Sequence, residues 1–314
     1  MYLYLATFRI PESMKVGAPV LRVRNVDTVL EFYENNLGLQ VNKIYRSNED
    51  EDDGGDGGNL IFELGFNQKE SSTQEPLLIL IHDPAATIPS SHSAGLFHFA
   101  ILVPDRKSLA STYLALRNSG VRYDGFADHL VSESIYLRDP ENNGIEIYRD
   151  RPAIEWPRDS EGRIMMDTLP LDLNSLSAEM NNMEDGRRNN AKAFPSGARI
   201  GHIHLRVTNL ERSIKFYHQK IGLDITLNWS SMGAAFLSAG GYHHHIGMNT
   251  WHSLNGKSHR SHEAGLENFT INIPDKSIVR TLISNIYGVN YAQKNQNQLF
   301  IPDPDGITFL IRSQ

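Results

Sequence analysis

Four segments of the chain alternate apolar and polar residues in the way that predicts a half-buried β-strand. They are residues 20–23, 98–103, 203–207 and 269–273. Each is followed by a residue suited to cap the start of a helix, namely Asn25, Asp105, Asn209 and Asp275. Apolar residues at helical spacing come next, and each predicted helix ends at a glycine: Gly38, Gly120, Gly222 and Gly288.

Further strands are predicted after each helix, for example at 234–237 and 244–248. The pattern therefore predicts an α+β protein built from four βαβββ modules, at about 18–83, 95–150, 199–252 and 265–313. The natural division is an N-terminal domain of residues 1–150, a connector of residues 151–198 and a C-terminal domain of residues 199–314.

The modules also resemble one another residue by residue. Residues 18–39 recur 184 positions later, at 202–223, and residues 95–146 match 265–308. Such self-similarity is the signature of duplicated structural units. At matched positions one copy carries His or Glu where the other carries an apolar or neutral side chain: His202 against Ala18, His98 against Asn268, and Glu146 against Thr308. These differences predict one site, formed by modules 2 and 3, while modules 1 and 4 have lost theirs.

Composition excludes several classes of function. The chain has 314 residues, a net charge of −7 and no block of Lys or Arg, so nucleic acid is not an expected partner. It contains no cysteine, which excludes disulfides and thiolate ligands. Neither a signal peptide nor an apolar stretch long enough to span a membrane is present, so we expect a cytoplasmic protein.

Two polar segments interrupt the modules. Residues 49–58 are acidic and then glycine-rich, without the ligand spacing of an EF-hand, so they predict a mobile surface loop. The connector contains a helix-length patch at 172–180 and ends in a polar run at 181–190. Connections of this length usually cover a functional site or link domains.

The strongest chemical candidates are His98, Glu146 and His202. Glu146 alternates with isoleucines in a closing strand, so its charge needs a partner if it is buried, and a divalent metal is one such partner. Two His and one carboxylate with open coordination positions form the facial triad of non-haem Fe(II) oxygenases.

At this level of detail the chain resembles the vicinal oxygen chelate superfamily, and within it the bacterial two-domain catechol 2,3-dioxygenases. The similarity rests on the Leu-Arg-Val openings, the Asp-Pro-x-x-Asn-Gly-Ile-Glu ending at 139–146, and the segments 128–133 and 236–247. It covers nearly the whole chain. The fold that it implies is two domains of the glyoxalase and extradiol dioxygenase type, each a curved, partly open β-barrel.

The resemblance also brings an extradiol ring-cleavage signature, a His, a Tyr, Asp-Pro and a Glu. Here it corresponds to His129, Tyr136, 139–140 and Glu146. The sequence departs from the signature at Ala127 and Asn142, and carries it in module 2, whereas many extradiol enzymes carry it in module 4. It implies that His129 and Tyr136 take part in catalysis.

Three consecutive histidines, His243, His244 and His245, lie on or beside the last strand of module 3. Alternation places His243 and His245 on one face and His244 on the other. We expect His245 to face the metal pocket, either as a fourth ligand or as the acid/base, with His243 on the same face. His204 shares a face with His202 and is expected to line the pocket.

The resemblance implies an oxidoreductase that holds Fe(II), or Mn(II) in its place, and acts on a catechol and O2 as small-molecule partners; it is also compatible with a homo-oligomer. Two alternatives stay open. A glyoxalase-type isomerase or lyase would use four ligands, for which His98, Glu146, His202 and His245 would serve. A metal-free member of the superfamily would only bind a small molecule, which the retained ligands argue against.

Overall fold

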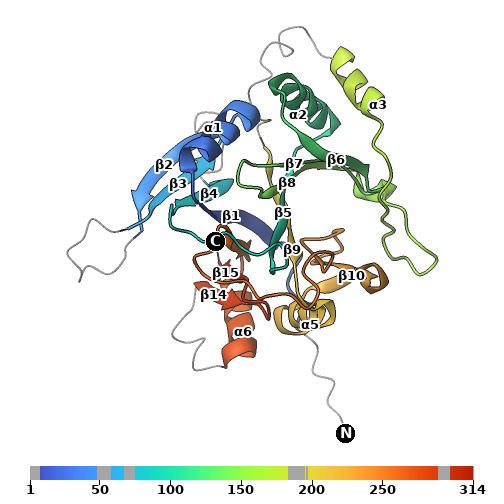
Figure 1. Cartoon of the computed structure of the whole chain (residues 1–314). Helices are drawn as coiled ribbons and strands as arrows, with labels where there is room; N and C mark the ends of the chain where they lie inside the picture. Colours follow the sequence, from blue (N-terminus) through green and yellow to red (C-terminus); the bar gives the residue numbers. More distant parts are fainter. Residues whose placement is uncertain are drawn as a thin grey trace.

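The computed structural model describes residues 8–47, 58–66, 75–182, 195, 197–288 and 298–313. Residues 49–57 of the acidic segment and 183–190 of the polar run lie outside these ranges. The fold is mixed α and β, with two curled sheets and few helices, as the sequence predicts (Figure 1). None of the helices in the described ranges is long and apolar enough to cross a membrane.

Modules 1 to 3 have the predicted βαβββ order, and module 4 shows βαββ in its described residues. Module 1 contains β1 (Lys15–Val23), α1 (Val26–Leu37), β2 (Gln40–Arg46), β3 (Leu60–Gly65) and β4 (Leu78–His82). Module 2 contains β5 (Gly95–Leu102), α2 (Arg106–Ser119), β6 (Tyr123–Asp128), β7 (Ser132–Arg138) and β8 (Gly144–Asp150). All four predicted caps accept a hydrogen bond from the first turn of their helix, for example Asp105 Oδ1 from Ser108 N at 2.7 Å.

Module 3 contains β9 (Arg199–Arg206), α5 (Leu210–Lys215) with its π-helical continuation η4 (Phe216–Ile221), β10 (Asp224–Trp229), the 3-10 turn η5 (Ser230–Met232), β11 (Ala234–Ser238) and β12 (Ile246–Asn249). Module 4 contains β13 (Gly265–Asn272), α6 (Lys276–Tyr287), β14 (Gln298–Pro302) and β15 (Thr308–Arg312). The connector carries η2 (Ala153–Glu155), α3 (Leu173–Ala178) and η3 (Glu179–Asn182).

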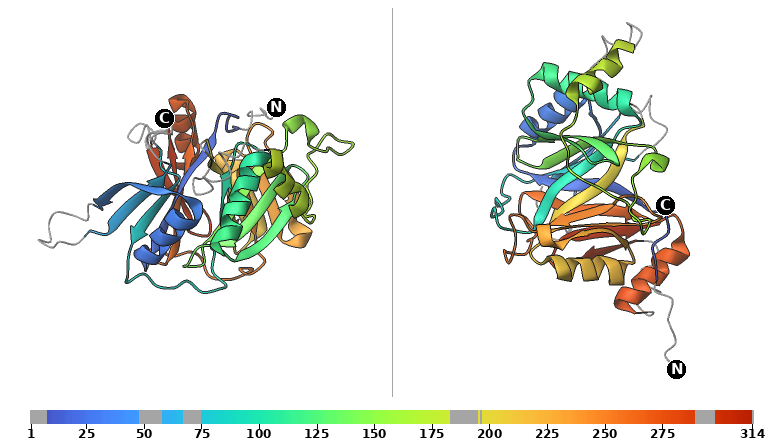
Figure 2. Two further views of the ribbon diagram at one scale, coloured as in Figure 1. Left: turned by 90° about the horizontal axis from the view of Figure 1, so that it is seen from above. Right: turned by 90° about the vertical axis from the view of Figure 1, so that its right-hand side faces the viewer.

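Each sheet combines one module from each half of the sequence. Modules 1 and 4 form the sheet β14-β15-β13-β1-β4-β3-β2, and modules 2 and 3 form β10-β11-β12-β9-β5-β8-β7-β6. The opening strands join the modules, because β1 pairs antiparallel with β13 and β5 pairs antiparallel with β9. The sheets therefore do not coincide with the two halves that the sequence suggested as domains (Figures 1 and 2).

Buried tyrosine–aspartate contacts link the modules of each half to one another. Tyr33 in α1 donates to Asp139 Oδ2 in the β7–β8 turn at 3.2 Å, and Tyr217 in η4 donates to Asp303 Oδ2 after β14 at 3.1 Å. Both carboxylates also accept backbone N–H groups of their own turns. The two sheets are thus held together by packing and by a repeated polar contact.

The stability of the fold should depend on pH through Asp303. Burial raises its pKa from 3.8 to about 7. Above pH 3.8 the unfolded chain releases the carboxyl proton, whereas the folded protein keeps it. The contribution of Asp303 to the free energy of unfolding is therefore complete below pH 3.8 and is lost as the pH rises to about 7. Because the pKa of Asp303 rises by about three units, this contribution is at most roughly 4 kcal/mol.

Asp303→Asn removes this titration and keeps the shape of the side chain. Urea unfolding of both proteins between pH 4.5 and 8 is expected to show the wild type losing stability relative to the variant as the pH rises. A difference in unfolding free energy that is constant across this range would contradict the assignment.

Candidate metal centre and substrate cavity

The middle of the second sheet brings the three predicted ligands together. Strand β5 lies between β8 and β9, and Ala100 on β5 is paired with Glu146 on one side and with His202 on the other. His98 lies two residues before Ala100, so its side chain leaves the same face of the sheet. The small, fully buried Ala100 leaves room above it for the three larger side chains.

The ligand atoms of these residues converge. Nε2 of His98 and Nε2 of His202 lie 2.9 Å and 3.0 Å from the same oxygen, Oε2 of Glu146. Donor atoms of the three residues all lie within 4.8 Å of one another. The other carboxylate oxygen, Oε1, accepts the hydroxyl of Ser134 at 2.7 Å, which holds the carboxylate in place. All three side chains are buried.

Electrostatics keep the set in the state that binds a cation. Burial alone would raise the pKa of Glu146, but the adjacent His202 and His98 rings hold it well below its usual value. Burial lowers the pKa of His202 to about 4, although Glu146 acts against this. At neutral pH the site thus has a carboxylate and an uncharged His202, and metal ligation requires both forms.

The residues fit a metal ion. Nε2 of His98 is buried and, within the described part of the chain, makes no hydrogen bond of good geometry, even though Glu146 is close. Buried polar atoms are normally satisfied, so an unsatisfied one demands an explanation. A cation among His98, Glu146 and His202 would supply the missing partner, because two imidazole nitrogens and one carboxylate are a donor set that binds divalent metals.

The first sheet repeats the arrangement without the ligands. Ala18, Asn268 and Thr308 occupy the matched positions on β1, β13 and β15, and Asn268 is paired directly with Thr308. Among the described residues, one cluster of His and acidic side chains has metal-ligand geometry, and it lies in the sheet of modules 2 and 3. Modules 2 and 3 share one sheet, which holds this cluster.

A cavity of about 390 Å³ is lined by two members of this cluster, His98 and Glu146, while His202 lies behind its lining. Its polar lining includes His98, Glu146, His129, Tyr136 and His244. The remaining lining is largely apolar and aromatic and includes Phe97, Leu137, Ile145, Met166, Trp229, Phe236 and Trp251. His204 lines it as expected, because Gly247 has no Cβ to occupy the space of the imidazole ring.

A larger cavity of about 830 Å³ adjoins this one and shares Phe97 and Arg138 with it. None of the three clustered ligands lines the larger cavity. We therefore assign the chemistry to the smaller cavity, and cavity size alone would have pointed to the wrong place.

His129 and Tyr136 form a pair at the wall of the cavity. Nδ1 of His129 lies 2.7 Å from the backbone oxygen of Asp167, which can only accept, so Nδ1 carries the proton. Nε2 of His129 then accepts the hydroxyl of Tyr136 at 2.7 Å. Burial, reinforced by Glu146, raises the pKa of Tyr136 well above its usual value, so Tyr136 is a donor at neutral pH.

The connector forms part of the cavity, in agreement with the prediction from its length. Met166 and Thr168 line the cavity, and Asp167 holds His129. Residue 169 makes an antiparallel bridge with Asp128 on β6. The predicted helix at 172–180 is confirmed as α3 and η3, which lie beside α2 (Figure 1).

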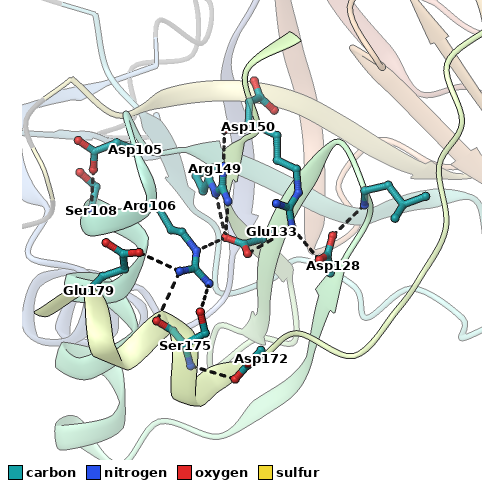
Figure 3. Close-up of polar contacts among 12 residues, drawn as sticks. Asp105, Arg106, Ser108, Asp128, Glu133, Arg149, Asp150, Asp172, Ser175 and Glu179 are labelled. Atoms are coloured by element: carbon teal, nitrogen blue, oxygen red, sulfur yellow. Dashed lines mark hydrogen bonds and ion pairs between the residues drawn. The ribbon is translucent and has the colours of Figure 1, made fainter. Parts of the chain in front are cut away.

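Buried charges fasten the connector to the sheet (Figure 3). Glu133 on β7 is 3% exposed and lies 2.8–3.4 Å from donors of Arg106, Arg149 and Arg151. Arg106 also donates to Glu179 at 2.9 Å, and so anchors the connector helix. A charge buried this deeply is tolerated because several hydrogen bonds compensate its desolvation.

The three consecutive histidines lie differently from the prediction. They precede β12 in a loop, and it is His244 that lines the cavity, its ring centroid 4.0 Å from that of His202. His245, which we expected to face the cavity, is turned away: its Nδ1 accepts Ala239 N–H at 3.3 Å and lies 3.0 Å from Ser238 Oγ. His243 likewise does not line the cavity.

A chain of hydrogen bonds behind the cavity orients His244. Asp150 Oδ1 accepts Nε2–H of His243 at 2.8 Å, which leaves Nδ1 of His243 to accept Nδ1–H of His244, also at 2.8 Å. Nε2 of His244 is then unprotonated. Tyr242 donates to Asp150 Oδ2 at 3.0 Å and contacts the hydroxyl of Tyr148 at 2.8 Å.

Sequence reasoning missed this support for His244. The sequence holds a partial sign of it, because Glu146, Tyr148 and Asp150 are spaced by two along β8 and so share a face of the sheet, but this spacing does not show which histidine Asp150 contacts. Gly201 is a second sign, since a Cβ there would lie 1.9 Å from the Tyr148 hydroxyl oxygen. Tyr148 can reach Tyr242 only because residue 201 lacks a side chain.

Comparisons with known proteins agree with this architecture. A sequence profile of the Glyoxalase/Bleomycin resistance protein/Dioxygenase superfamily matches residues 15–147 and 199–272. A catechol-2,3-dioxygenase from Bacillus subtilis (strain 168) is 35% identical over 308 residues, which cover 96% of this chain and 99% of that protein.

Solved structures show the same fold. A presumed dioxygenase from Bacillus subtilis subsp. subtilis strain 168 superposes with a TM-score of 0.61 at 13% identity, covering 97% of this chain and 86% of that one. Glyoxalase I from Zea mays superposes with a TM-score of 0.53 at 16% identity, covering 96% and 92%.

Proposed function

The chain belongs to the Glyoxalase/Bleomycin resistance protein/Dioxygenase superfamily, and from this premise we propose that it is an extradiol ring-cleaving dioxygenase, a catechol 2,3-dioxygenase. The reaction inserts both atoms of O2 next to the diol of a catechol and yields a 2-hydroxymuconic semialdehyde. His98, Glu146 and His202 are the proposed ligands of a mononuclear Fe(II) centre, with Mn(II) as a substitute that the same ligands accommodate. The name of the relative that is 35% identical supports this choice of reaction.

One observation carries the proposal: in the described part of the chain His98, Glu146 and His202 form a cluster of three, and no fourth His, Asp or Glu joins it. A glyoxalase-type site would need His245 as the additional ligand, but Nδ1 of His245 bonds to the backbone N–H of Ala239 instead. A three-ligand site keeps positions for two reactants, and a ring-cleaving dioxygenase requires these positions.

When bound, Fe(II) supplies a coordination sphere in which the two oxygens of a catechol and dioxygen meet in a fixed geometry. The protein's own contribution is the surroundings. Ser134 fixes the orientation of the Glu146 carboxylate. Phe97, Phe236 and Trp251 line the cavity with apolar aromatic surface and contact neighbouring rings.

His244 is the proposed acid/base. Its Nε2 is left without a proton by the bonds from Asp150 through His243 to Nδ1, so this atom can take the proton of a catechol hydroxyl and return it later. Burial lowers the pKa of His244 well below its usual value, which keeps the ring neutral before substrate binds. The role that sequence reasoning gave to His245 or His243 therefore passes to His244.

His129 and Tyr136 are proposed to position the substrate. Tyr136 keeps its proton and directs it at His129, so its oxygen presents lone pairs to the cavity. A catechol hydroxyl can donate to that oxygen, and this contact orients the ring before the proton moves to His244. The Asp167 backbone oxygen on the connector fixes the tautomer of His129 on which this arrangement depends.

The function is tested with protein purified without added metal and reconstituted under nitrogen with Fe(II). We expect oxygen uptake with catechol, one O2 per catechol consumed, and a yellow ring-cleavage product. Oxygen uptake that fails with both Fe(II) and Mn(II), together with turnover of a hemithioacetal that depends on Ni(II) or Zn(II), would assign the site to the glyoxalase type instead. If neither catechol nor the hemithioacetal is turned over with any of these metals, the protein would instead be a member of the superfamily that only binds a small molecule.

A further inference from the structure

The cavity has few means of binding a negative charge on the substrate. Arg138 is the lone Lys or Arg among the described residues that line it. Its Nε donates to Asp124 Oδ2 at 2.6 Å and its Nη1 to the backbone oxygen of Asn142 at 3.2 Å. Asp124 also lines the cavity, so a substrate carboxylate that approached Arg138 would meet the aspartate as well.

The rest of the outer lining is suited to uncharged groups. Trp251, Phe97, His204, Phe236 and Trp229 form a continuous series of ring contacts, with centroid separations of 5.0–6.0 Å between neighbours. Such a wall stabilises apolar and aromatic groups by burial and by ring stacking.

There is also space for a substituent on the ring. The cavity of about 390 Å³ lies in the lower range of small-ligand sites and exceeds what a single ring needs. Gly125 on β6 lines it, and a Cβ placed there would have no heavy atom within 4 Å. Gly125 therefore adds no side chain to the lining next to Asp124 in the sequence.

From this arrangement we propose that the cavity selects catechols that are unsubstituted or carry an uncharged, apolar substituent, and that Asp124 is the residue that rejects carboxylated catechols by neutralising Arg138. The inference rests on the proposed ring-cleaving function and specifies its substrate class. Asp124 binds the guanidinium of Arg138, which is then not free to bind a substrate carboxylate. The negative charge of Asp124 also repels that carboxylate.

The test compares 4-methylcatechol with 3,4-dihydroxybenzoate, which differ mainly in the charge of one small substituent. Wild-type holoenzyme is expected to favour 4-methylcatechol in kcat/KM. Asp124→Asn should raise the kcat/KM for 3,4-dihydroxybenzoate relative to 4-methylcatechol by roughly five- to tenfold, the effect of one new charged hydrogen bond at a partly exposed rim. Adding Arg138→Gln to this variant should abolish the gain.

The matched control is Asp224→Asn, which removes the same charge from another exposed pair, Arg9–Asp224, on a residue that lines neither cavity. It is expected to leave the ratio of the two substrates unchanged. A wild type that cleaves both substrates equally well, or an Asp124→Asn variant with an unchanged ratio, overturns the selection rule while the dioxygenase assignment stands. A wild type that cleaves no catechol at all overturns both.

Discussion

Replacing Glu146 by alanine is expected to remove the metal and, with it, ring cleavage. Glu146 Oε2 is the atom that both histidines approach, and Glu146 is the only carboxylate in the described cluster. Losing an outer partner of a metal ligand already costs about 10–100-fold in affinity or activity, so losing the carboxylate itself should cost more. Metal content by elemental analysis and oxygen uptake with catechol should both fall to background.

Thr308→Ala provides the matched control, because Thr308 occupies the position of Glu146 in the duplicated module. It should bind one metal ion per chain and cleave catechol like the wild type. A Glu146→Ala protein that still binds one equivalent of metal would refute the proposed centre. A Thr308→Ala protein that loses its metal would refute the view that modules 1 and 4 carry no site.

The sequence predicted the modules well because each is a local pattern. A strand period of two, a capping residue and a terminal glycine lie within a few tens of residues of one another, and the duplication repeats them four times. Even the pairing of modules 2 and 3 was predictable, since only that pair gathers His98, Glu146 and His202. The composition of each sheet depends on contacts between strands that are far apart in the sequence. The predicted N-terminal and C-terminal halves therefore do not correspond to the two sheets.

The choice among the three consecutive histidines could not be made from the sequence. Alternation separated His244 from its neighbours, but it did not show which of the two sets of side chains faces the cavity. That depends on the turn before the three histidines. Gly240 and Gly241 both adopt positive φ angles, 65° and 73°, which turn the chain before it enters β12. His243 is then held by a hydrogen bond to Asp150, which lies 93 residues away in the sequence, and no local sequence pattern predicts such a contact.

His244→Ala is expected to lower kcat for catechol by about 10²- to 10⁴-fold while the metal content stays at one per chain, because general acid–base catalysis by a positioned side chain contributes about that much. His244 lines the cavity but lies outside the cluster of three ligands, so removing it should affect proton transfer and leave metal binding intact. Single-turnover kinetics with the reconstituted variant would separate this loss from slower product release.

His245→Ala is the control that distinguishes the two histidines. Its ring is buried against Tyr242 and Ser238, so the variant is expected to unfold at a lower temperature but to keep kcat within a few-fold of wild type once folded. If His245→Ala loses turnover and His244→Ala does not, the acid/base is His245, as its place in the sequence suggested. Loss of metal in His244→Ala would instead make His244 a fourth ligand, because its ring already lies against His202.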